Sequence, residues 1–281
     1  MNCRNCTQEI PDLEEKCPTC GWYAGPPNVR IVGKKEERDA LEARYKSAID
    51  KSLTDGSNAP LLSFESGVKT SSAVINMELD YLHQFMTNDR LLYTTYGLMV
   101  AGQVRKPAAS DNDAHRRAIG AMLFGGYDEE IRYAALSLDG SGPKSYGGYS
   151  VKLREITVAD RATLLENNSY HFVPNHNLAA GDPIPLGYRA VWREKHKLAV
   201  SKLSGRIFSS TVATDYPNIL LSNAGDRAGD EFLEVHIYGA FDNKAIEAVK
   251  GSSRVKSKLD RARISQIKDY LHRDGKLWIE E

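Results

Sequence analysis

Four cysteines near the start of the chain have the types and spacing of a metal site. They form two pairs, Cys3-x2-Cys6 and Cys17-x2-Cys20, and no other cysteine occurs among the 281 residues. Each C-x2-C turn presents two sulfurs from one short loop, and four thiolates favour tetrahedral zinc. Disulfides of a secreted domain are the alternative, but no signal peptide opens the chain. We expect a structural zinc, because four thiolates leave no coordination position open for chemistry.

A second group of polar residues lies in the stretch 124–169. Arg132 opens an expected strand, 131–138, and the glycine-rich loop 139–148 joins it to another, 149–153. A third strand, 162–165, is followed by Asn167, Asn168 and Ser169. A charged residue at a strand end, facing a glycine-rich loop and a polar cluster, is typical of a site for an anionic ligand.

A carboxylate and a histidine share one face of a late strand. Strand alternation over 232–238 places Glu234 and His236 on one side and Leu233, Val235 and Ile237 on the other. The apolar set must face the core, so we expect Glu234 and His236 to face a cleft or solvent. The run 205–212 is also strand-like and carries three hydroxyl side chains.

These residues need elements to position them. Apolar spacing predicts helices over 34–53, 73–86, 89–100, 188–203 and 255–272, with a short helix over 243–249. The pattern divides the chain into a zinc ribbon or knuckle (1–24), a linker and helix (25–60), a main domain (61–250) and a C-terminal basic helix and tail (251–281). The knuckle could contact nucleic acid, a partner protein or the rest of its own chain.

Composition gives ordinary bounds. Lys plus Arg equals Asp plus Glu at 37 each, so net charge provides no argument for nucleic-acid steering. No apolar run approaches the roughly 20 residues that a membrane span requires. The expectation is a soluble cytoplasmic protein without a membrane partner, large enough to bury a core without disulfides.

The order of several motifs resembles a bacterial family. The chain reads FESG, LFGGYxxxxRYAAL, YGGYSVKL, RATLLENNS and FLEVHIYG over about residues 61–250. This order is similar to an uncharacterised toxin-like group assigned to the ADP-ribosyltransferase fold, whose members read roughly QFETGxSNG, FGGAY, RPKYGALNL, FGSxxFxL, RxTFTxGDS and EAQIHG. The resemblance implies an α+β fold with an ADP-ribosyltransferase-like core of two packed β-sheets and surrounding helices.

The resemblance also implies roles for individual residues. Enzymes of this fold carry a basic residue on an early strand, a hydroxyl or aromatic residue on a middle one and a glutamate on a late one. Arg132, Ser169 and Glu234 fill these places as catalytic residues. The expected contacts to NAD come from Arg132, Tyr133, Tyr146, Asn168, Ser169 and His236. The run Phe208-Ser-Ser-Thr211 is a competing match for the hydroxyl motif.

This chain departs from the family pattern at three points. Asn167-Asn168 replaces glycine-aspartate before the serine, His236 replaces a glutamine, and Tyr133 follows Arg132 where the family has proline. Each of the three expected catalytic residues also has an ordinary structural interpretation: Arg132 in a salt bridge, Ser169 as a helix cap and Glu234 as a solvated strand residue.

The expected function is that of a toxin that transfers ADP-ribose from NAD to a protein or nucleic acid, in conflict between bacteria or with phage. An antitoxin protein is a possible partner. Cleavage of the nicotinamide–ribose bond passes through an oxocarbenium-like state, which a carboxylate stabilises. The alternatives are an NAD glycohydrolase, with water as acceptor, and a non-enzymatic zinc-ribbon adaptor that binds nucleic acid or protein.

Overall fold

The protein is built around one mixed β-sheet of eight strands. The computed structural model describes residues 1–94, 118–179, 181–227 and 229–281. Its strand order is β10-β9-β3-β1-β2-β8-β4-β5, with β10 parallel to β9 and the other neighbours antiparallel. The strands are β1 (Ser72–Met77), β2 (Ile131–Ser137), β3 (Tyr149–Leu153), β4 (Ala162–Leu165), β5 (Arg189–Val191), β8 (Glu234–Tyr238), β9 (Ile246–Gly251) and β10 (Leu277–Glu280). A second sheet contains only β6 (Leu221–Ser222) and β7 (Glu231–Phe232).

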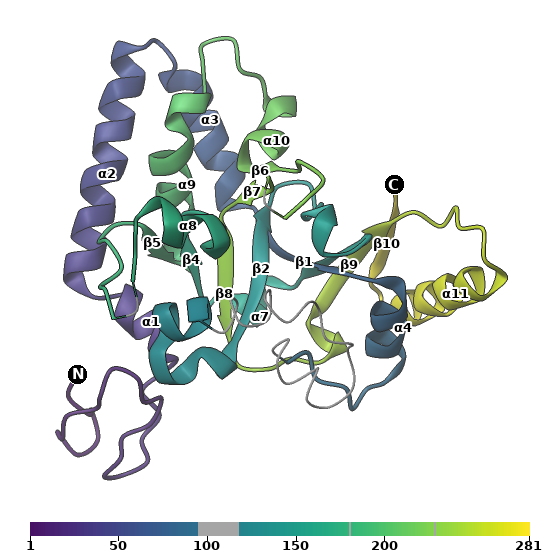
Figure 1. Ribbon diagram of the computed structural model, residues 1–281, viewed down its shortest axis with the longest axis horizontal. Coiled ribbons are helices and arrows are strands. Elements are labelled where there is room, and N and C mark those ends of the chain that lie inside the picture. Colours follow the sequence, from purple (N-terminus) through teal and green to yellow (C-terminus); the bar gives the residue numbers. More distant parts are fainter. Residues whose placement is uncertain (95–117, 180, 228) are drawn as a thin grey trace.

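Figure 1 shows two groups of helices, α2, α3, α9 and α10 in one group and α4 with α11 in the other, near β9 and β10. The α-helices are α1 (Pro27–Val32), α2 (Lys35–Thr54), α3 (Asn58–Lys69), α4 (Leu79–Thr87), α7 (Glu155–Val158), α8 (Ser169–Asn175), α9 (Lys195–Leu203), α10 (Tyr216–Leu220) and α11 (Lys258–Arg273). Residues 118–124 are also helical. Short 3-10 turns are η1 (Gly125–Glu130), η2 (Lys144–Tyr146), η3 (Trp192–Glu194), η4 (Ser204–Arg206), η5 (Ala213–Asp215) and η6 (Asn243–Ala245).

The register of the strands gives the sheet an apolar and a polar face. Residues opposite one another in paired strands project to the same side. Ala134, Leu136, Val235 and Ile237 project into the main core, which also contains Phe64, Phe85, Leu198 and Ile267 from the helices. The alternate positions of the same strands carry Glu234 and His236 on the opposite face.

The expected α+β class is confirmed, but the expected pair of packed sheets is met only coarsely. One sheet contains eight strands and the other only two. The small sheet packs on β2 through Leu221, Phe232 and Ala135. The small sheet cannot extend further along β7, because after Phe232 the chain passes through Leu233 into β8 of the large sheet.

The sequence predicted most of the elements in the central part of the chain. Strands β2, β3, β4 and β8 and helices α2 and α11 lie where alternation and apolar spacing placed them. The helix expected over 188–203 is helical only from residue 192, because its first residues form β5. The strand expected over 205–212 is wrong, since its first residues form a 3-10 turn and Phe208 is exposed.

Two helix predictions near other strands are wrong in part, for a common reason. Residues 73–86 divide into β1 and α4, and residues 243–249 form η6 and the start of β9. Short apolar runs fit a buried strand as well as a buried helix, and the neighbouring strands decide between them.

The helix expected over 89–100 is not found in its described part. Residues 89–94 contain a turn and the isolated bridge Tyr93–Phe241, whereas 95–100 lie outside the described residues.

The segments that the sequence places before and after the main domain are integral to it. In the 25–60 segment, Asn28 is 2% exposed and donates to the carbonyl oxygen of His236 on β8. In the 251–281 segment, α11 packs on α4 and β10 extends the sheet beside β9. Among the described helices, none has a stretch long and apolar enough to cross a bilayer.

Candidate active site and metal centre

The four cysteines come together in the N-terminal ribbon. Their sulfurs all lie within 4.8 Å of one another, with Cys3–Cys20 at 3.6 Å and Cys6–Cys17 at 3.5 Å. Tetrahedral zinc with Zn–S bonds of about 2.3 Å requires sulfur separations of about 3.8 Å. The backbone N–H of Asn5 points to the Cys3 sulfur at 3.4 Å, as in a turn that presents two thiolates. The donor set and its spacing therefore fit a structural zinc.

The ribbon docks on the body of its own chain. Arg30 of α1 donates through Nη2 to the carbonyl oxygens of Pro11, at 3.3 Å, and Asp12, at 3.1 Å, and it also bonds to Glu14. Lys34 pairs with the Asp12 carboxylate. In Figure 1 the N-terminal segment lies beside α1, at the same end of the molecule as η1. Of the three contacts considered for the ribbon, the structure contains the one with its own chain.

Glu234 lies at the centre of a buried polar cluster on the sheet. Its Oε2 accepts from the backbone N of Ser169 at 3.3 Å and from the Ser169 hydroxyl at 3.2 Å. Its Oε1 lies 2.7 Å from Nε2 of His236. A carboxylate offers about four lone-pair sites. The two Ser169 donors and the His236 nitrogen, in the tautomer that carries the proton on Nε2, occupy three of these sites and leave about one open.

The start of α8 positions Ser169. Asn168 is the N-cap of this helix, and its side-chain oxygen accepts from the backbone N of Tyr170 at 3.0 Å. The amide of Asn168 also donates to the Tyr146 hydroxyl at 3.2 Å. The cap is therefore Asn168 and not Ser169, which is the first residue of the helix and has its hydroxyl turned to Glu234. An asparagine before a helix is a common cap, so the local geometry follows from the sequence.

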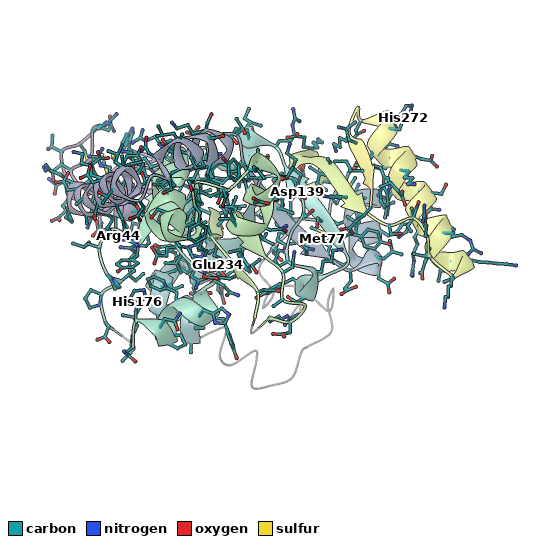
Figure 2. All side chains as sticks on the ribbon, turned by 90° about the horizontal axis from the view of Figure 1, so that it is seen from above. Arg44, Met77, Asp139, His176, Glu234 and His272 are labelled. Atoms are coloured by element: carbon teal, nitrogen blue, oxygen red, sulfur yellow. The ribbon has the colours of Figure 1, made fainter. Side chains whose placement is uncertain are left out.

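Aromatic rings surround the histidine. The His236 ring contacts Phe124 and Tyr133 edge to face, with centroid distances of 4.8 and 5.4 Å. Tyr133 is 37% exposed, whereas His236 is 3% and Glu234 6% exposed. Glu234 lies well inside the molecule in Figure 2. Of the two environments expected for Glu234 and His236, a cleft or solvent, open solvent is wrong, because Ser169 and the rings cover them.

The structure does not bring Arg132 to this cluster. Arg132 pairs in register with Ile237, a core residue, whereas Tyr133 pairs with His236. Arg132 therefore projects from the opposite face of the sheet. It is 3% exposed and donates to the Glu129 carbonyl at 3.1 Å and to the Glu130 carboxylate at 3.3 Å. Its ordinary interpretation, a buried salt bridge, is the one that its contacts support.

Two other cations lie near the cluster and were not singled out from the sequence. Lys202 of α9 donates to the side chain of Asn167 at 3.2 Å and pairs with Glu231 at 3.3 Å. Arg227 lies over the Tyr146 ring, with its guanidinium carbon 5.0 Å from the centroid. Neither residue belongs to a motif, so only tertiary contact could have identified them.

Burial and charge act together on the Lys202 pair. Burial lowers the pKa of Lys202 and outweighs the attraction of Glu231. Burial also opposes the ionisation of Glu231, but the charges of Lys202 and Arg206 hold the pKa of that carboxyl below its usual range. The carboxylate of Glu231 therefore pairs with two cations, Lys202 and Arg206.

The competing hydroxyl motif lies apart from this cluster. The Phe208–Thr211 run has no hydrogen bond to Glu234 or His236 among the described residues, so the cluster contains Ser169 and not the competing motif.

A comparison with models of protein families finds no match, and a comparison with curated protein sequences finds none either.

Proposed function

We propose that the protein is an ADP-ribosyltransferase that uses Glu234 as its catalytic carboxylate. The observation that carries this proposal is the convergence of Glu234, Ser169 and His236 from two distant segments. All three belong to the motifs RATLLENNS and FLEVHIYG of the sequence. The resemblance to toxin-like transferases supplies the substrate, NAD, and the type of reaction.

The chemistry requires a negative charge beside the sugar. As the nicotinamide leaves, positive charge develops on the ribose, and a fixed carboxylate stabilises it. Glu234 is held by Ser169 and His236, so it needs little reorganisation as that charge forms. Its remaining lone pair would accept from a ribose hydroxyl. Tyr133 and Tyr146 border the cluster and would contact the nicotinamide or the ribose.

In this proposal, cations other than Arg132 bind the phosphates of NAD. Lys202 donates to Asn167, two residues before Ser169, and Arg227 lies over the ring of Tyr146, whose hydroxyl accepts from Asn168. They would bind the phosphates of NAD. Lysine and arginine both bind phosphate, lysine as a point charge and arginine through paired hydrogen bonds.

One experiment tests the enzymatic assignment. Purified protein is incubated with labelled NAD, and protein, RNA and DNA fractions are separated. We expect label on one macromolecular fraction and a loss of at least about 100-fold in Glu234→Gln. The exposed Glu36→Gln is the matched control, because it removes an equal charge from a side chain that takes no part in the contacts of Glu234. Equal NAD turnover by the wild type and Glu234→Gln refutes the role of this carboxylate. NAD loss without any labelled acceptor identifies a glycohydrolase.

The biological setting of this proposal is conflict between bacteria or with phage. As a cytoplasmic toxin, the protein would modify an essential protein or nucleic acid and would be held in check by an antitoxin. Expression in a bacterial host should arrest growth with the wild type and not with Glu234→Gln. Equal growth arrest by both proteins counts against a toxic ADP-ribosyl transfer.

We also propose that the four-cysteine cluster binds zinc and that the metal holds the ribbon against α1. The fit of the sulfur separations supports this ion. Zinc would be structural, so its role is to fold residues 1–24 rather than to act on NAD.

A non-enzymatic adaptor is the second candidate, and one observation favours it. Arg132 and Glu234 project from opposite faces of the sheet, so the pair that the resemblance predicts does not form a joint site. An adaptor would bind nucleic acid or protein and consume no NAD, which the labelled-NAD experiment measures directly.

A further inference from the structure

A cavity of about 190 Å³ opens on the polar face of the sheet, over β3 and β9. One water occupies about 30 Å³ of liquid volume, so the cavity has room for a group of about six water volumes. Its walls include the side chains of Ser72, Ser150, Lys152 and Lys250, together with Asp139 and Ile279.

Hydrogen-bond donors converge on this cavity. The Ser150 hydroxyl accepts from the backbone N of Gly142 at 2.9 Å and from Asn76 at 3.3 Å. Both of its lone pairs are then occupied, and its own proton is left to donate. Among the described residues, the Ser72 hydroxyl has no hydrogen-bond partner.

The ammonium group of Lys152 adds to these donors, and Lys250 adds positive charge. Lys152 pairs with Glu247 at 2.6 Å, and an ammonium has three N–H groups, so two remain for a ligand. Lys250 donates to the Ser141 hydroxyl at 2.6 Å, the Asp139 carboxylate at 3.0 Å and the Asp139 carbonyl at 3.5 Å, so its three N–H groups are engaged by the loop.

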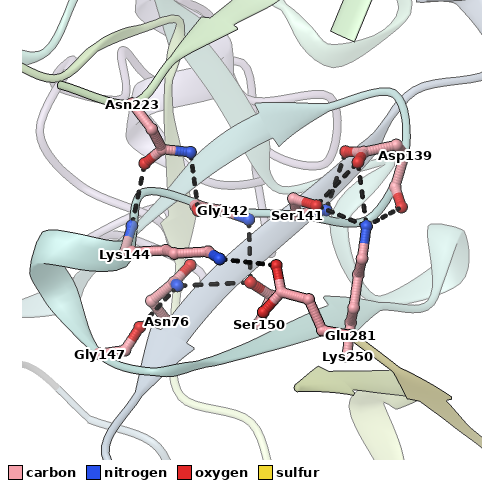
Figure 3. A network of polar contacts seen from close by, with 10 residues as sticks. All are labelled: Asn76, Asp139, Ser141, Gly142, Lys144, Gly147, Ser150, Asn223, Lys250 and Glu281. Carbon is pink, nitrogen blue, oxygen red and sulfur yellow. Dashed lines mark hydrogen bonds and ion pairs between the residues drawn. The ribbon is translucent and has the colours of Figure 1, made fainter. Parts of the chain in front are cut away.

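The carboxylate in the cavity wall, that of Asp139, is already hydrogen-bonded to neighbouring residues. Asp139 accepts from the backbone N and hydroxyl of Ser141 and from Lys250 (Figure 3). It also accepts from the Ser137 hydroxyl. Burial opposes its ionisation, but hydrogen bonds from Ser141 and Lys250 lower the pKa of Asp139 to about 2. Its charge is therefore shared among four donor groups and does not titrate near neutral pH.

The cavity is separate from the Glu234 cluster. Lys152, Val74, Ala135 and Glu234 are successive partners across four strands. Three strand spacings of about 4.8 Å place Lys152 roughly 14 Å from Glu234 along the sheet. The loop lies between them, since a Cβ on Gly142 would be 3.1 Å from Cγ1 of Val74. Figure 2 also shows Asp139 apart from Glu234.

We propose that this cavity is a binding site for a phosphate group, either free or as a monoester of a small molecule. The open N–H groups of Lys152 and the hydroxyls of Ser72 and Ser150, beside the positive charge of Lys250, match the several acceptor oxygens of a tetrahedral anion better than the two of a carboxylate. The site does not depend on the reaction at Glu234, and it remains testable if that reaction is absent.

The test uses the full-length, zinc-loaded protein and three probes. Inorganic phosphate, ribose 5-phosphate and unphosphorylated ribose are titrated at constant ionic strength set with chloride, and backbone amide shifts are followed by NMR. We expect saturable shifts at Gly140, Ser150 and Lys152 with one or both phosphates and none with ribose. Tighter binding of ribose 5-phosphate than of inorganic phosphate would identify a monoester as the ligand. Shifts that chloride reproduces, or that never saturate, overturn the proposal.

Variants separate this site from general attraction to a lysine-rich surface. Lys152→Met should weaken phosphate binding by at least about tenfold, and Ser72→Ala by about fivefold. Lys51→Met is the matched control, because Lys51 is also paired with a carboxylate but lies on exposed α2. Equal weakening in Lys51→Met contradicts the site. If Lys152→Met does not fold, unchanged affinity in Ser72→Ala has the same meaning.

Discussion

At the scale of single residues, the central observation is that Glu234 has partners on both carboxylate oxygens. Ser169 donates twice to Oε2, and His236 contacts Oε1. A buried carboxylate is costly unless such donors are present. The same contacts that make its burial possible also hold it in one orientation, which is the property a catalytic carboxylate needs.

The Ser169 hydroxyl provides the first prediction. Ser169→Ala removes one of the two bonds to Oε2 and retains the backbone bond, so we expect a loss of about 1 kcal/mol in the free energy of unfolding. NAD turnover should fall by about tenfold, less than in Glu234→Gln. Denaturant unfolding and initial rates measure the two effects. A turnover equal to that of the wild type would show that the Ser169 hydroxyl does not orient Glu234 for catalysis.

Gly147 provides a second prediction at this scale. It has φ +151°, and a Cβ there would lie 2.4 Å from the carbonyl carbon of Met77. Gly147→Ala should therefore cost at least about 2 kcal/mol of unfolding free energy, because the loop must move off the sheet. Gly148→Ala is the neighbouring control, since nothing lies within 4 Å of its Cβ position. Equal midpoints of denaturant unfolding for the two variants would contradict this reason for the glycine.

At the scale of elements, the ribbon and α9 are held in place in different ways, the ribbon by its cysteine cluster and α9 by packing against other helices. The ribbon has a core of only Cys3, Ile10 and Cys17 with Trp22 and Ala24 beside it. A core of this size cannot fold a segment without a metal or another crosslink. The α9 helix instead packs against α2 and α3 and buries a histidine there.

Metal removal tests the ribbon. We expect one zinc per chain in freshly purified, reduced protein, and we expect chelation or Cys3→Ser to make residues 1–24 sensitive to protease. The body should stay folded, because its core is separate from that of the ribbon. The exposed Thr19→Ser serves as the control. Metal analysis with less than one zinc per chain counts against the site.

The buried histidine on α9 gives a pH prediction. Burial lowers the pKa of His196, and the charges of Lys69 and Lys197 act in the same direction against Glu65. As pH falls below about 6.5, the unfolded chain takes up a proton at this position and the folded chain does not. Stability should therefore decrease between pH 7.5 and 5.5.

His196→Gln isolates this effect. The variant should lose less unfolding free energy than the wild type over the same range, by at most about 1.4 kcal/mol per pH unit. Thermal melts at three pH values measure the difference. Parallel pH profiles for the two proteins would show that His196 is not the responsible group.

At the scale of the whole molecule, both ends of the chain contribute to one body. The last strand, β10, lies parallel to β9 and its Trp278 ring packs near Tyr149, with a centroid distance of 6.0 Å. Lys268 of α11 lies 4.8 Å from the centroid of the same ring. The C-terminal segment is therefore part of the sheet rather than an appended helix and tail.

Trp278→Ala tests this integration. We expect a single unfolding transition at a lower midpoint, with a loss of about 1–3 kcal/mol, because the ring is partly buried against the main core. Leu277→Ala should change stability by at most about 0.5 kcal/mol, since Leu277 is 61% exposed. A separate early transition with an unchanged main transition would mean that the C-terminal segment unfolds independently.

The sequence by itself determined the features that depend on neighbouring residues. Cysteine spacing determined the metal-type cluster, alternation determined β2, β3, β4 and β8, and apolar spacing determined α2 and α11. These signals are local because thiolate turns, strand pleat and helical pitch repeat over a few residues. The grouping of Glu234 with His236 on one strand face has the same local origin.

Only the tertiary structure decided which faces and segments meet. It paired Arg132 with Ile237 and so separated this arginine from Glu234, and it brought Lys202 and Arg227 near Asn167 and Tyr146. It also made strands of the short apolar runs in β1 and β9 and placed a cavity beside the glycine-rich loop. Strand register and packing between distant segments depend on the whole chain, which is why no single motif could specify them.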